Sequence, residues 1–495
     1  MPTQRARATV ARGPLDVDDP GAQPAEAVPA GPRRRPAPRL DTVVAVALGV
    51  VGLRLGLAPL HDNSFLTHLA TGRLILDEGG VPRTDPYSFT ALGDPWTVQS
   101  WGASVLYAGI EQVAGLGGIR LVVGLCSALL AVLAWELTRP AGRLVGRLVV
   151  VVPVVAVGSS FWSPRPLIFG LVFLAVVLLA AEGRFDPRWL VPVLWVWANV
   201  HGSFPLGLAA LATLAVGRAL DRGSPRIELR ALAWAGLGTL LAAVNPLGPK
   251  LLLFPLQLLQ RREAFAEIVE WKPPQWQSWG ERAFALQLVL AVVVLLVRGR
   301  RWRAAVPLVV FGVAALTSMR NIPQASLVIA LGTAAGLADL GTIDGARRTP
   351  IARPVVAVLG VLALLLTAGM LTQPHTDLSS YPTRSAAWMR GEGLLDLESR
   401  VVTRDYVGNY FEARFGPDEV RTYVDDRVDM FPLAVIRDYT SLLDPGTDYQ
   451  AVLERARATA VLWDRDSDLG RWLERTSRWR IVHRDADWLV ALPAT

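Results

Sequence analysis

Cysteine and charged residues are both scarce in this chain of 495 residues. The single cysteine, Cys126, lies within an apolar run, so an intrachain disulfide and a cysteine metal site are both excluded. Asp, Glu, Lys and Arg make up only 19% of the residues, whereas soluble proteins have roughly 25%. The C-terminal part also lacks a glycine-rich phosphate loop, a metal-ligand cluster and a nucleophile motif. These absences exclude the common motifs of soluble enzymes.

Long apolar runs are what the chain has instead. Hydrophobic residues make up 52% of the sequence and the mean hydropathy is +0.35. The apolar residues come in blocks of about 11 to 19 separated by joins rich in Arg and Pro, a pattern typical of multi-span membrane proteins. We therefore predict a mainly α-helical, polytopic membrane bundle of about eleven spans. The predicted spans are 42–60, 119–137, 148–162, 167–181, 189–199, 206–216, 231–244, 283–297, 304–317, 325–337 and 355–371.

The N-terminal segment, residues 1–40, is rich in Pro, Ala and Arg and has few large apolar side chains. Such a segment cannot bury enough surface to fold, so we expect a disordered cytoplasmic tail. Arginines before the first span favour a cytoplasmic N-terminus. For the same reason the net charge of +7 indicates membrane topology, and we expect no nucleic-acid partner.

The distribution of arginine predicts the orientation of the spans. Residues 102–114 form a weaker apolar run, interrupted by Glu111 and Gln112, and we expect them to be interfacial or re-entrant. If that run does not cross the membrane, most of the arginines lie in every second join between spans. Such an excess of arginine is typical of cytoplasmic loops. If the run crossed, every later arginine cluster would lie outside. The inner arginines are Arg139, Arg143, Arg147, Arg184, Arg188, Arg218, Arg222, Arg226, Arg230, Arg298, Arg300, Arg301, Arg303, Arg347, Arg348 and Arg353.

This topology predicts a multi-pass plasma-membrane protein with three regions. They are the tail at 1–40, a membrane domain at 41–374 whose first external loop spans 61–117, and an extracytoplasmic domain at 375–495. The last region is less apolar and alternates strand and helix patterns, so we predict a small α/β domain. Its predicted strands are 400–403, 421–425, 460–463, 480–483 and 488–492, and its predicted helices are 385–397, 407–414, 431–443 and 449–458.

The first external loop, residues 61–101, carries the densest polar chemistry. Asn63 or Ser64 is expected to cap a short helix that ends at Gly79-Gly80 and lies flat on the membrane, with Phe65 and Leu69 on its apolar face. Asp62 precedes this helix at the mouth of the bundle, where burial can shift the pKa of a carboxylate. Asp62 is therefore the candidate catalytic residue. The other acidic residues are expected to be solvated: Asp77, Glu78, Asp85 and Asp94.

Several further polar residues lie at the predicted outer ends of spans. Arg165 and Arg320 are lone arginines that run against the topological bias, so each is expected to have an anionic partner, either a protein carboxylate or a phosphate. The tryptophans Trp271, Trp276 and Trp279 suit an interfacial belt. The candidate substrate-binding residues are His68, Arg165, Asn199, His201, Lys250, Arg320 and Asn321.

A resemblance to a known group rests on several strings. They are residues 61–72, VPRTDPYSFT at 81–90, WANVHGS at 197–203, NPLG at 245–248, RNIP at 320–323 and YVDDR at 423–427. Together they resemble a bacterial group of membrane glycosyltransferases of the type-C (GT-C) superfamily, which includes protein mannosyltransferases and aminoarabinose transferases. Many members carry an Asp-Pro-Asp-like pair at the start of the loop. This chain has HDNSF at 61–65, so the second acid of that pair is absent.

The resemblance implies transfer of a sugar from a polyprenyl-phosphate carrier to an acceptor hydroxyl on a glycan, lipid or protein at the outer face. Asp62 would then be the base, and the arginines, with His201 or Lys250, would hold the phosphate. No cofactor is implied with certainty, although a divalent metal is possible. Two other classes stay open on the sequence alone: a transporter or flippase of lipid-linked envelope precursors, and a non-catalytic envelope assembly protein.

Overall fold

The computed structural model describes residues 39–265, 268–299, 301–338 and 352–494. Residues 38–495 form one compact unit, and the predicted tail lies outside the described residues. So do three arginines used for the predicted orientation, Arg300, Arg347 and Arg348. The tail, the domain boundaries and the side of the membrane on which each end lies therefore stay predictions.

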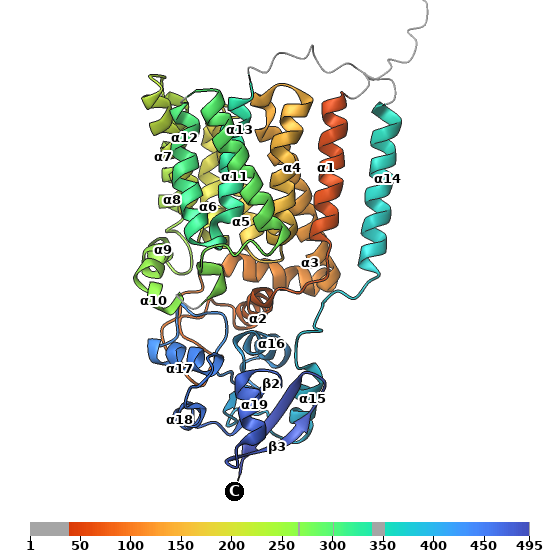
Figure 1. The fold of residues 1–495 in the computed structure, drawn as a ribbon, viewed down its shortest axis with the longest axis vertical. Coiled ribbons are helices and arrows are strands. Elements are labelled where there is room, and N and C mark those ends of the chain that lie inside the picture. Colours follow the sequence, from red (N-terminus) through yellow and green to blue (C-terminus); the bar gives the residue numbers. More distant parts are fainter. Residues whose placement is uncertain (1–38, 266–267, 300, 339–351, 495) are drawn as a thin grey trace, which may run out of the picture. The chain divides into compact units, whose positions relative to one another are not determined.

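Helices correspond to all eleven predicted apolar runs, and Figure 1 shows most of them side by side. They are α1 (Leu40–Gly56), α3 (Trp101–Leu137), α4 (Leu144–Phe161), α5 (Leu167–Ala181), α6 (Leu190–Val200), α7 (Pro205–Leu220), α8 (Arg226–Leu241), α11 (Trp279–Val297), α12 (Trp302–Thr317), α13 (Ile322–Gly336) and α14 (Ala352–Leu371).

The prediction of eleven spans is nevertheless too high by length and composition. Among the described residues, only four segments are long and apolar enough to cross a membrane: Trp101–Ala141, Leu144–Phe161, Trp279–Val297 and Arg353–Leu371. Three shorter apolar helices are Leu167–Ala181, Pro205–Leu220 and Trp302–Thr317. The physical reason is the helical rise, because 11 to 17 residues at about 1.5 Å each span only some 16 to 26 Å of a roughly 30 Å hydrocarbon layer.

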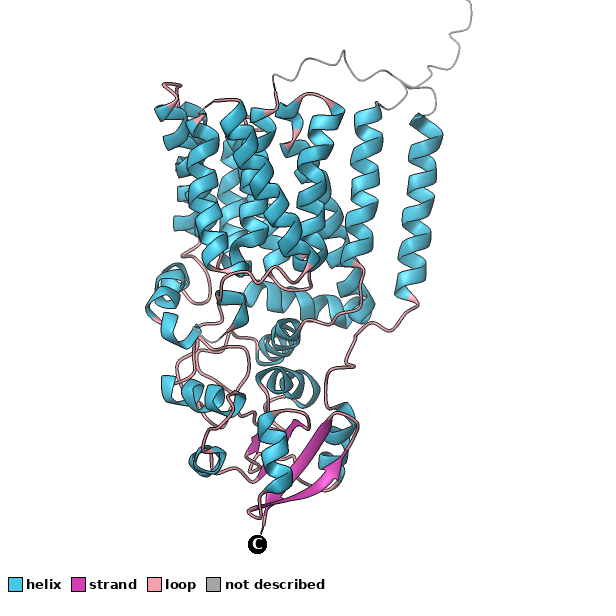
Figure 2. Ribbon diagram, viewed as in Figure 1, coloured by secondary structure: helices cyan, strands magenta, loops and turns pink. Residues whose placement is uncertain are grey.

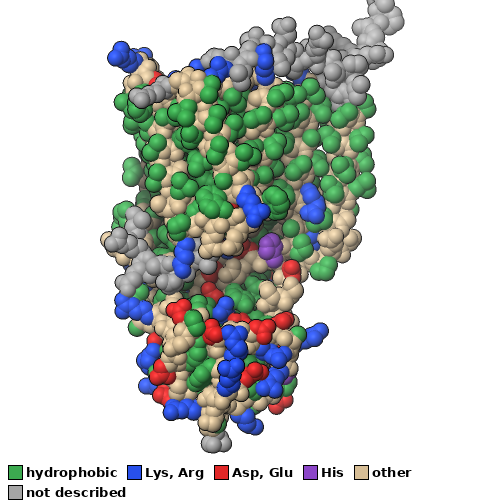
Figure 3. Space-filling model, viewed as in Figure 1, with side chains coloured by type: hydrophobic (Ala, Val, Ile, Leu, Met, Phe, Trp, Pro, Cys, Tyr) green, Lys and Arg blue, Asp and Glu red, His purple; other side chains and the backbone are tan. Residues whose placement is uncertain are grey.

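Burial divides the bundle into a packed centre and an apolar outer surface. Helices α5 and α13 are buried along most of their length, whereas Val358, Leu364 and Leu365 of α14 are exposed. Figure 3 shows hydrophobic side chains covering the visible face of the bundle. Inside it, Gln287 Nε2 donates to the Ser326 carbonyl and Ser326 Oγ to Gln287 Oε1, both at 2.7 Å, so this buried polar pair is satisfied within the protein.

Helix α3 changes direction at Gly115, whose φ of 63° only glycine adopts readily. In Figure 1 the orange part of α3 before this point lies across the ends of the other helices. This arrangement agrees with the expectation that residues 102–114 do not continue the span. Val113 in this part is 90% exposed, as an interfacial side chain would be.

Helix α2 (Asn63–Glu78) follows α1 and lies beside the first part of α3. At their crossing, a Cβ on Gly72 would come within 1.9 Å of the Ser104 carbonyl oxygen, so close contact requires glycine there. Arg73 binds Glu111 of α3 at 2.5 and 2.7 Å and the Ala413 carbonyl of α16 (Asp405–Phe415) at 2.7 Å. The prediction that α2 lies flat on the membrane is therefore wrong, because its apolar residues pack against protein on both sides.

The C-terminal segment contains all the named strands, drawn magenta in Figure 2. The sheet order is β1-β2-β4-β3, with β1 parallel to β2 and the other pairs antiparallel. The strands are β1 (Val401–Val402), β2 (Ala460–Asp464), β3 (Trp479–Arg484) and β4 (Trp488–Pro493), and the helices are α15 (Thr383–Gly391), α16, α17 (Leu433–Leu443), α18 (Tyr449–Arg455) and α19 (Asp468–Arg475). A small sheet with helices is confirmed.

The predicted strand at 421–425 is wrong, and α19 was not predicted. Residues 421–425 run beside the first loop, where Thr422 forms a single parallel bridge with Ser88. The segment therefore pairs with another loop at one position and does not join the sheet. Helix α19 is amphipathic, with Leu469 and Leu473 buried on one face, but at eight residues it is shorter than the windows in which helical periodicity is recognised.

Arg427 joins the C-terminal segment to the first loop through a buried ion network. Its guanidinium, only 6% exposed, binds Asp85 at 2.8 Å, Asp425 at 2.6 Å and Glu412 at 3.2 Å. The rings of Tyr87 and Trp96 lie 4.9 and 4.5 Å from it. Asp85 is therefore buried and the expectation that it is solvated is wrong.

Replacing Arg427 by Met is expected to lower the midpoint of thermal unfolding strongly, because three buried carboxylates lose their cation. Losing one partner of a buried ion network costs about 3–5 kcal/mol. Differential scanning fluorimetry in detergent measures the change. The matched control is Arg471→Met, which removes an exposed ion pair with Asp468 and should change the midpoint little. Equal midpoints for wild type and Arg427→Met would contradict the assigned role.

Candidate functional site

Arg165 is the centre of a charged cluster at one end of the bundle, in the loop between α4 and α5. Its Nε lies 2.6 Å from Asp62 Oδ2, it also forms an ion pair with Glu270, and its Nη2 donates to Asn63 Oδ1 at 3.3 Å. The loop is held in place because the Tyr107 hydroxyl donates to the Pro164 carbonyl at 2.7 Å. The predicted anionic partner of Arg165 is thus a pair of protein carboxylates.

Asp62 has two structural bonds in this cluster. It is the N-cap of α2, since its Oδ1 accepts a hydrogen bond from the Ser64 backbone at 3.0 Å, and its Oδ2 binds Arg165. The expectation that Asn63 or Ser64 caps the helix is off by one or two residues. The Asp62 side chain is 9% exposed. An ion pair and a cap fix its position at the end of α1, where the sequence placed it.

Glu270 is the residue of the cluster that sequence reasoning did not select. It belongs to η3 (Val269–Trp271), which lies beside η4 (Met319–Asn321). Met319 N donates to the Lys272 carbonyl at 3.0 Å and Ser318 Oγ to the Glu270 carbonyl at 3.1 Å. These bonds bring Glu270 and Arg320 into one region. Nothing in the sequence around Glu270 indicates that it meets Arg165, which lies 105 residues earlier in the chain.

Arg320 stacks on Trp271, with its guanidinium carbon 5.1 Å from the ring centroid. Burial lowers the pKa of Arg320, and Glu270 opposes that change. For Arg165, burial acts in the same direction, but Asp62 and Glu270 outweigh it and raise the pKa. Trp271 therefore contacts a site residue in addition to any interfacial role.

Burial raises the pKa of the Glu270 carboxyl, but Arg165 and then Arg320 outweigh it, so the pKa lies below the ordinary value of 4.5. Glu270 is therefore ionised near pH 7. With Asp62 it balances the positive charge of the two arginines.

The two predicted histidines also belong to this cluster. His68 on α2 lies 3.1 Å from Ser104 Oγ through Nδ1, and burial followed by Arg165 lowers its pKa to about 4. His201 follows α6, and its Nδ1 lies 2.7 Å from Ser203 Oγ. Burial, then Arg320, lowers the pKa of His201 to about 3. Both imidazoles are neutral near pH 7 and can donate or accept a hydrogen bond without adding charge.

The remaining predicted residues either form hydrogen bonds within the bundle or lie outside the cluster around Arg165. Asn199 Oδ1 accepts from Trp101 Nε1 at 2.9 Å and its Nδ2 donates to the Trp195 carbonyl. Asn321 donates to the Ala314 carbonyl at 3.0 Å, satisfying the end of α12. Lys250 is exposed at the start of α9 (Lys250–Gln260). Within the described residues, no hydrogen bond or ion pair joins these three to Arg165.

The C-terminal segment adds two carboxylates to the cluster. Asp426 Oδ1 accepts from Thr67 Oγ1 of α2 at 3.4 Å, and its electrostatic neighbours include Arg165. Burial, then Asp425, raises the pKa of Asp426 to about 7. Burial also raises the pKa of Asp429 to about 6, and Asp429 interacts with Arg320. The string at 423–427 had drawn notice, but its two acids could not be told apart from the sequence.

A hollow adjoins the cluster. A cavity of about 430 Å³ is lined by the ends of α1 and α4 and by the neighbouring loops, including His61 and Pro164, which flank Asp62 and Arg165 in the chain. Leu55, Leu60 and Trp162 give it apolar walls. On the face drawn in Figure 3 the surface is hollowed between the apolar bundle and the charged C-terminal segment, and acidic side chains are visible there.

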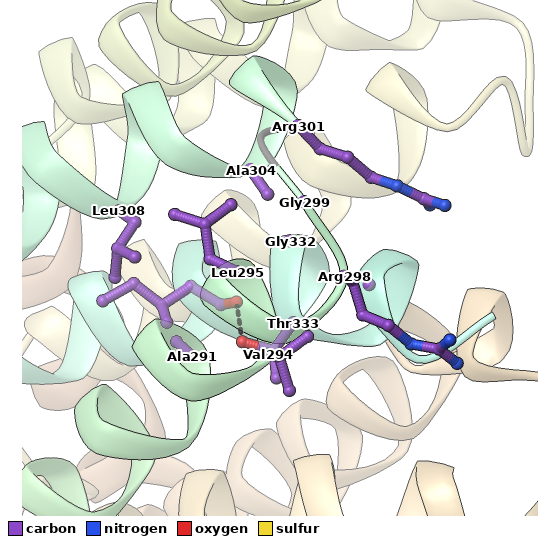
Figure 4. Close-up of a pocket in the computed structure, with 12 residues that line it drawn as sticks. Ala291, Val294, Leu295, Arg298, Gly299, Arg301, Ala304, Leu308, Gly332 and Thr333 are labelled. Atoms are coloured by element: carbon purple, nitrogen blue, oxygen red, sulfur yellow. Dashed lines mark hydrogen bonds between the residues drawn. The ribbon is translucent and has the colours of Figure 1, made fainter. Parts of the chain in front are cut away.

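A second cavity, of about 340 Å³, lies between α11, α12 and α13 (Figure 4). Its lining is apolar except for Thr333 and two arginines, Arg298 and Arg301, and it includes no carboxylate or imidazole. Those arginines follow the end of α11 opposite to the end near Glu270. This cavity has none of the groups that proton transfer requires, so it is not the candidate site.

A divalent metal was possible on the sequence. Across the described parts of the chain, no group of three or more His, Cys, Asp and Glu side chains is placed to hold a metal ion. Asp62 and Glu270 are instead bound by Arg165. These two acids thus have a protein cation as their partner.

The chain was compared with family models, curated proteins and solved structures. No family model matches the chain, and no curated protein matches its sequence. Among solved structures, arabinofuranosyltransferase AftD from mycobacteria superposes with a TM-score of 0.45 and 14% sequence identity. The match covers 93% of this chain but 42% of that one, so this chain spans less than half the length of AftD. A superposition this loose carries no argument about fold or activity.

The cluster predicts a pH-dependent contribution of Glu270 to stability. Because its folded-state pKa lies below 4.5, the stabilisation is present above the unfolded-state value and is lost as pH falls through the folded-state value. Glu270→Gln should therefore unfold at a lower temperature than wild type at pH 7, with the difference shrinking below about pH 4. Thermal unfolding in detergent across this range measures it.

The control is Glu419→Gln, which breaks an exposed ion pair with Arg390 and should leave the curve unchanged. A constant difference between wild type and Glu270→Gln at every pH would show that the ion pair with Arg165 is not its source.

Proposed function

We propose that the protein is an integral membrane glycosyltransferase that moves a sugar from a polyprenyl-phosphate carrier to an acceptor hydroxyl. The observation that carries the proposal is the partly exposed cluster of Arg165, Arg320, Asp62 and Asp426 at the end of an apolar bundle. The cluster combines cations for a phosphate with carboxylates for a proton.

The two arginines suit a phosphate that gains charge during the reaction. Arginine forms paired, charge-assisted hydrogen bonds with phosphate oxygens, and in a partly buried site these are stronger than in water. Arg320 has a ring contact and no carboxylate within ion-pair distance in the described residues, so it can bind an additional anion. Neutral His68 and His201 can supply further hydrogen bonds to phosphate or sugar hydroxyls.

The apolar surroundings suit a lipid carrier. In the part of the chain that the structure describes, four helices are long and apolar enough to cross a membrane. The hollow beside His61 and Pro164 has apolar walls. A polyprenyl chain could lie against such a surface while its phosphate reaches Arg165 and Arg320. We place the site on the outer face, because the arginine-rich joins follow the opposite ends of the helices.

The reaction forms one bond and breaks one. The acceptor oxygen bonds to the anomeric carbon of the sugar as the bond from that carbon to the phosphate oxygen breaks. Polyprenyl phosphate leaves with the bonding pair and an additional negative charge, which the arginines stabilise. A carboxylate accepts the proton of the acceptor hydroxyl. Two carboxylates of the cluster are available for it, Asp62 and Asp426.

A transporter or flippase of envelope precursors is less well supported. Transporters place their sites near mid-membrane on broken helices. Here the charged cluster lies at the ends of helices, and the buried pair of Gln287 and Ser326 satisfies itself. A non-catalytic assembly role gives no reason for two arginines and two carboxyls with raised pKa values to gather in one cluster.

Replacing Arg320 by Met is expected to lower the rate of sugar transfer about 100-fold, as removal of one charge-stabilising donor does. The assay uses purified protein in mixed micelles with radiolabelled polyprenyl-phosphate pentoses and hexoses and alkyl glycosides as acceptors. Arg282→Met is the control, because Arg282 is exposed and lies over Trp279 in a similar ring contact outside the cluster. Product formation at the wild-type rate by Arg320→Met, or none by wild type with any donor, would contradict the proposal.

A further inference from the structure

We infer that Asp426, delivered by the C-terminal segment, accepts the proton of the acceptor hydroxyl, and that Asp62 is a positioning residue for Arg165. The inference rests on the proposed function. It assigns different roles to two nearby carboxylates from the hydrogen bonds and ion pairs that each forms. The role of base, which the sequence suggested for Asp62, passes to Asp426.

Asp62 and Asp426 lie on either side of Ser64. The Ser64 backbone nitrogen donates to Asp62 Oδ1 at 3.0 Å, and the Ser64 hydroxyl hydrogen-bonds to Asp426. Thr67, one turn further along α2, reaches Asp426 Oδ1 at 3.4 Å. The first turn of α2 therefore holds the two carboxylates in one site, although they are more than 360 residues apart in the chain.

Asp62 is engaged on both oxygens. One accepts the N-cap bond of α2 and the other receives Arg165 Nε at 2.6 Å. Both oxygens of Asp62 are therefore occupied, and an acceptor hydroxyl could bond to this carboxylate only by competing with Arg165 or with the Ser64 backbone N–H. The geometry of Asp62 suits the task of aiming Arg165 at a phosphate.

Asp426 has the opposite environment. Its contacts in the site are hydroxyls of Ser64 and Thr67, and its backbone nitrogen is fixed by Asn409 Oδ1 at 3.1 Å. It is half-buried, whereas its neighbours Asp425 and Arg427 are fully buried in their own ion network. Asp426 can therefore meet a substrate hydroxyl without losing an ion pair.

The charges around Asp426 come from every element packed on it. Its own segment supplies Asp425, α16 supplies Asp405 and Glu412, and the bundle supplies Arg165 and Arg320, with Tyr381 also nearby. Burial and the neighbouring acids outweigh the arginines, which accounts for the pKa of about 7. A base with this pKa is matched to proton transfer near neutral pH.

The closing experiment compares pH profiles of sugar transfer in the micelle assay for wild type, Asp426→Asn, Asp426→Glu and Asp62→Asn. For wild type, kcat/KM should rise about tenfold per pH unit below pH 7 and level off above it, because only ionised Asp426 accepts the proton. Asp426→Asn should lose about 10²- to 10⁴-fold in kcat with this rise abolished. Asp426→Glu should restore part of the rate, and Asp62→Asn should be slower but keep the rise near pH 7.

Folding is checked separately. A carboxyl whose pKa is raised in the folded state stabilises the fold at low pH and loses that contribution as pH rises through the folded value. Asp426→Asn should therefore unfold at the same or a higher temperature than wild type at pH 8. Asp418→Asn, an exposed acid of the same segment, should keep the wild-type rate and profile.

Three outcomes overturn the inference. Asp426→Asn could keep the rise near pH 7, Asp62→Asn could abolish it, or Asp429→Asn could abolish it while Asp426→Asn does not. Either of the first two outcomes would mean that Asp62 or the substrate itself accepts the proton. The third would mean that Asp429 accepts it. Wild type that transfers no sugar would instead overturn the proposed function, and the inference with it.

Discussion

The pairing of Arg165 with Asp62 and Glu270 is the interaction on which the candidate site depends. A guanidinium at the end of an apolar bundle is costly unless its charge and hydrogen bonds are matched. The two carboxylates come from the start of α2 and from η3, so the ion pairs of this one side chain fix the first loop against the loop around residue 270. Arg320 then joins through Trp271. The cluster is thus a consequence of burying one arginine where helices from distant parts of the chain end.

A second arginine that needs carboxylate partners fixes the position of the C-terminal segment. Arg427 is buried against the first loop and needs the carboxylates of Asp85, Asp425 and Glu412. Helix α2 is held between this segment and α3, with Arg73 bonding to both. The loop that looked like an interfacial element is therefore an interior layer of the protein. The buried Arg427 and the half-buried Arg165 both bind acids of the first loop, which explains why this loop and the C-terminal segment hold a common site.

Sequence reasoning found the elements and the principal side chains, and it missed how they meet. Hydrophobic runs predicted each bundle helix, because burial in lipid or core has a local signature. The isolated positions of Arg165 and Arg320 predicted an anionic partner for each. Arg165 has two such partners, Asp62 and Glu270, whereas Arg320 contacts the ring of Trp271. Glu270, Asp85 and Asp426 could not be distinguished from ordinary surface acids, since what distinguishes them is a partner 100 to 360 residues away. The predicted number of spans was wrong because an apolar run in the sequence does not show how long its helix is or whether that helix is long enough to cross a membrane.

The buried network also explains why Asp426 differs from Asp62. Arg427 is surrounded by three acids, so the network has an excess of negative charge. Asp425 is adjacent to Asp426 in the chain, and its charge, added to burial, disfavours a further carboxylate charge there. Asp62 instead forms an ion pair with Arg165, which Glu270 shares. One structural ion network and one site ion pair thus push two neighbouring carboxylates toward different roles, one holding a cation and one able to exchange a proton near neutral pH. The first loop supplies Asp62 to the site, and the fold supplies Asp426 from the other end of the chain.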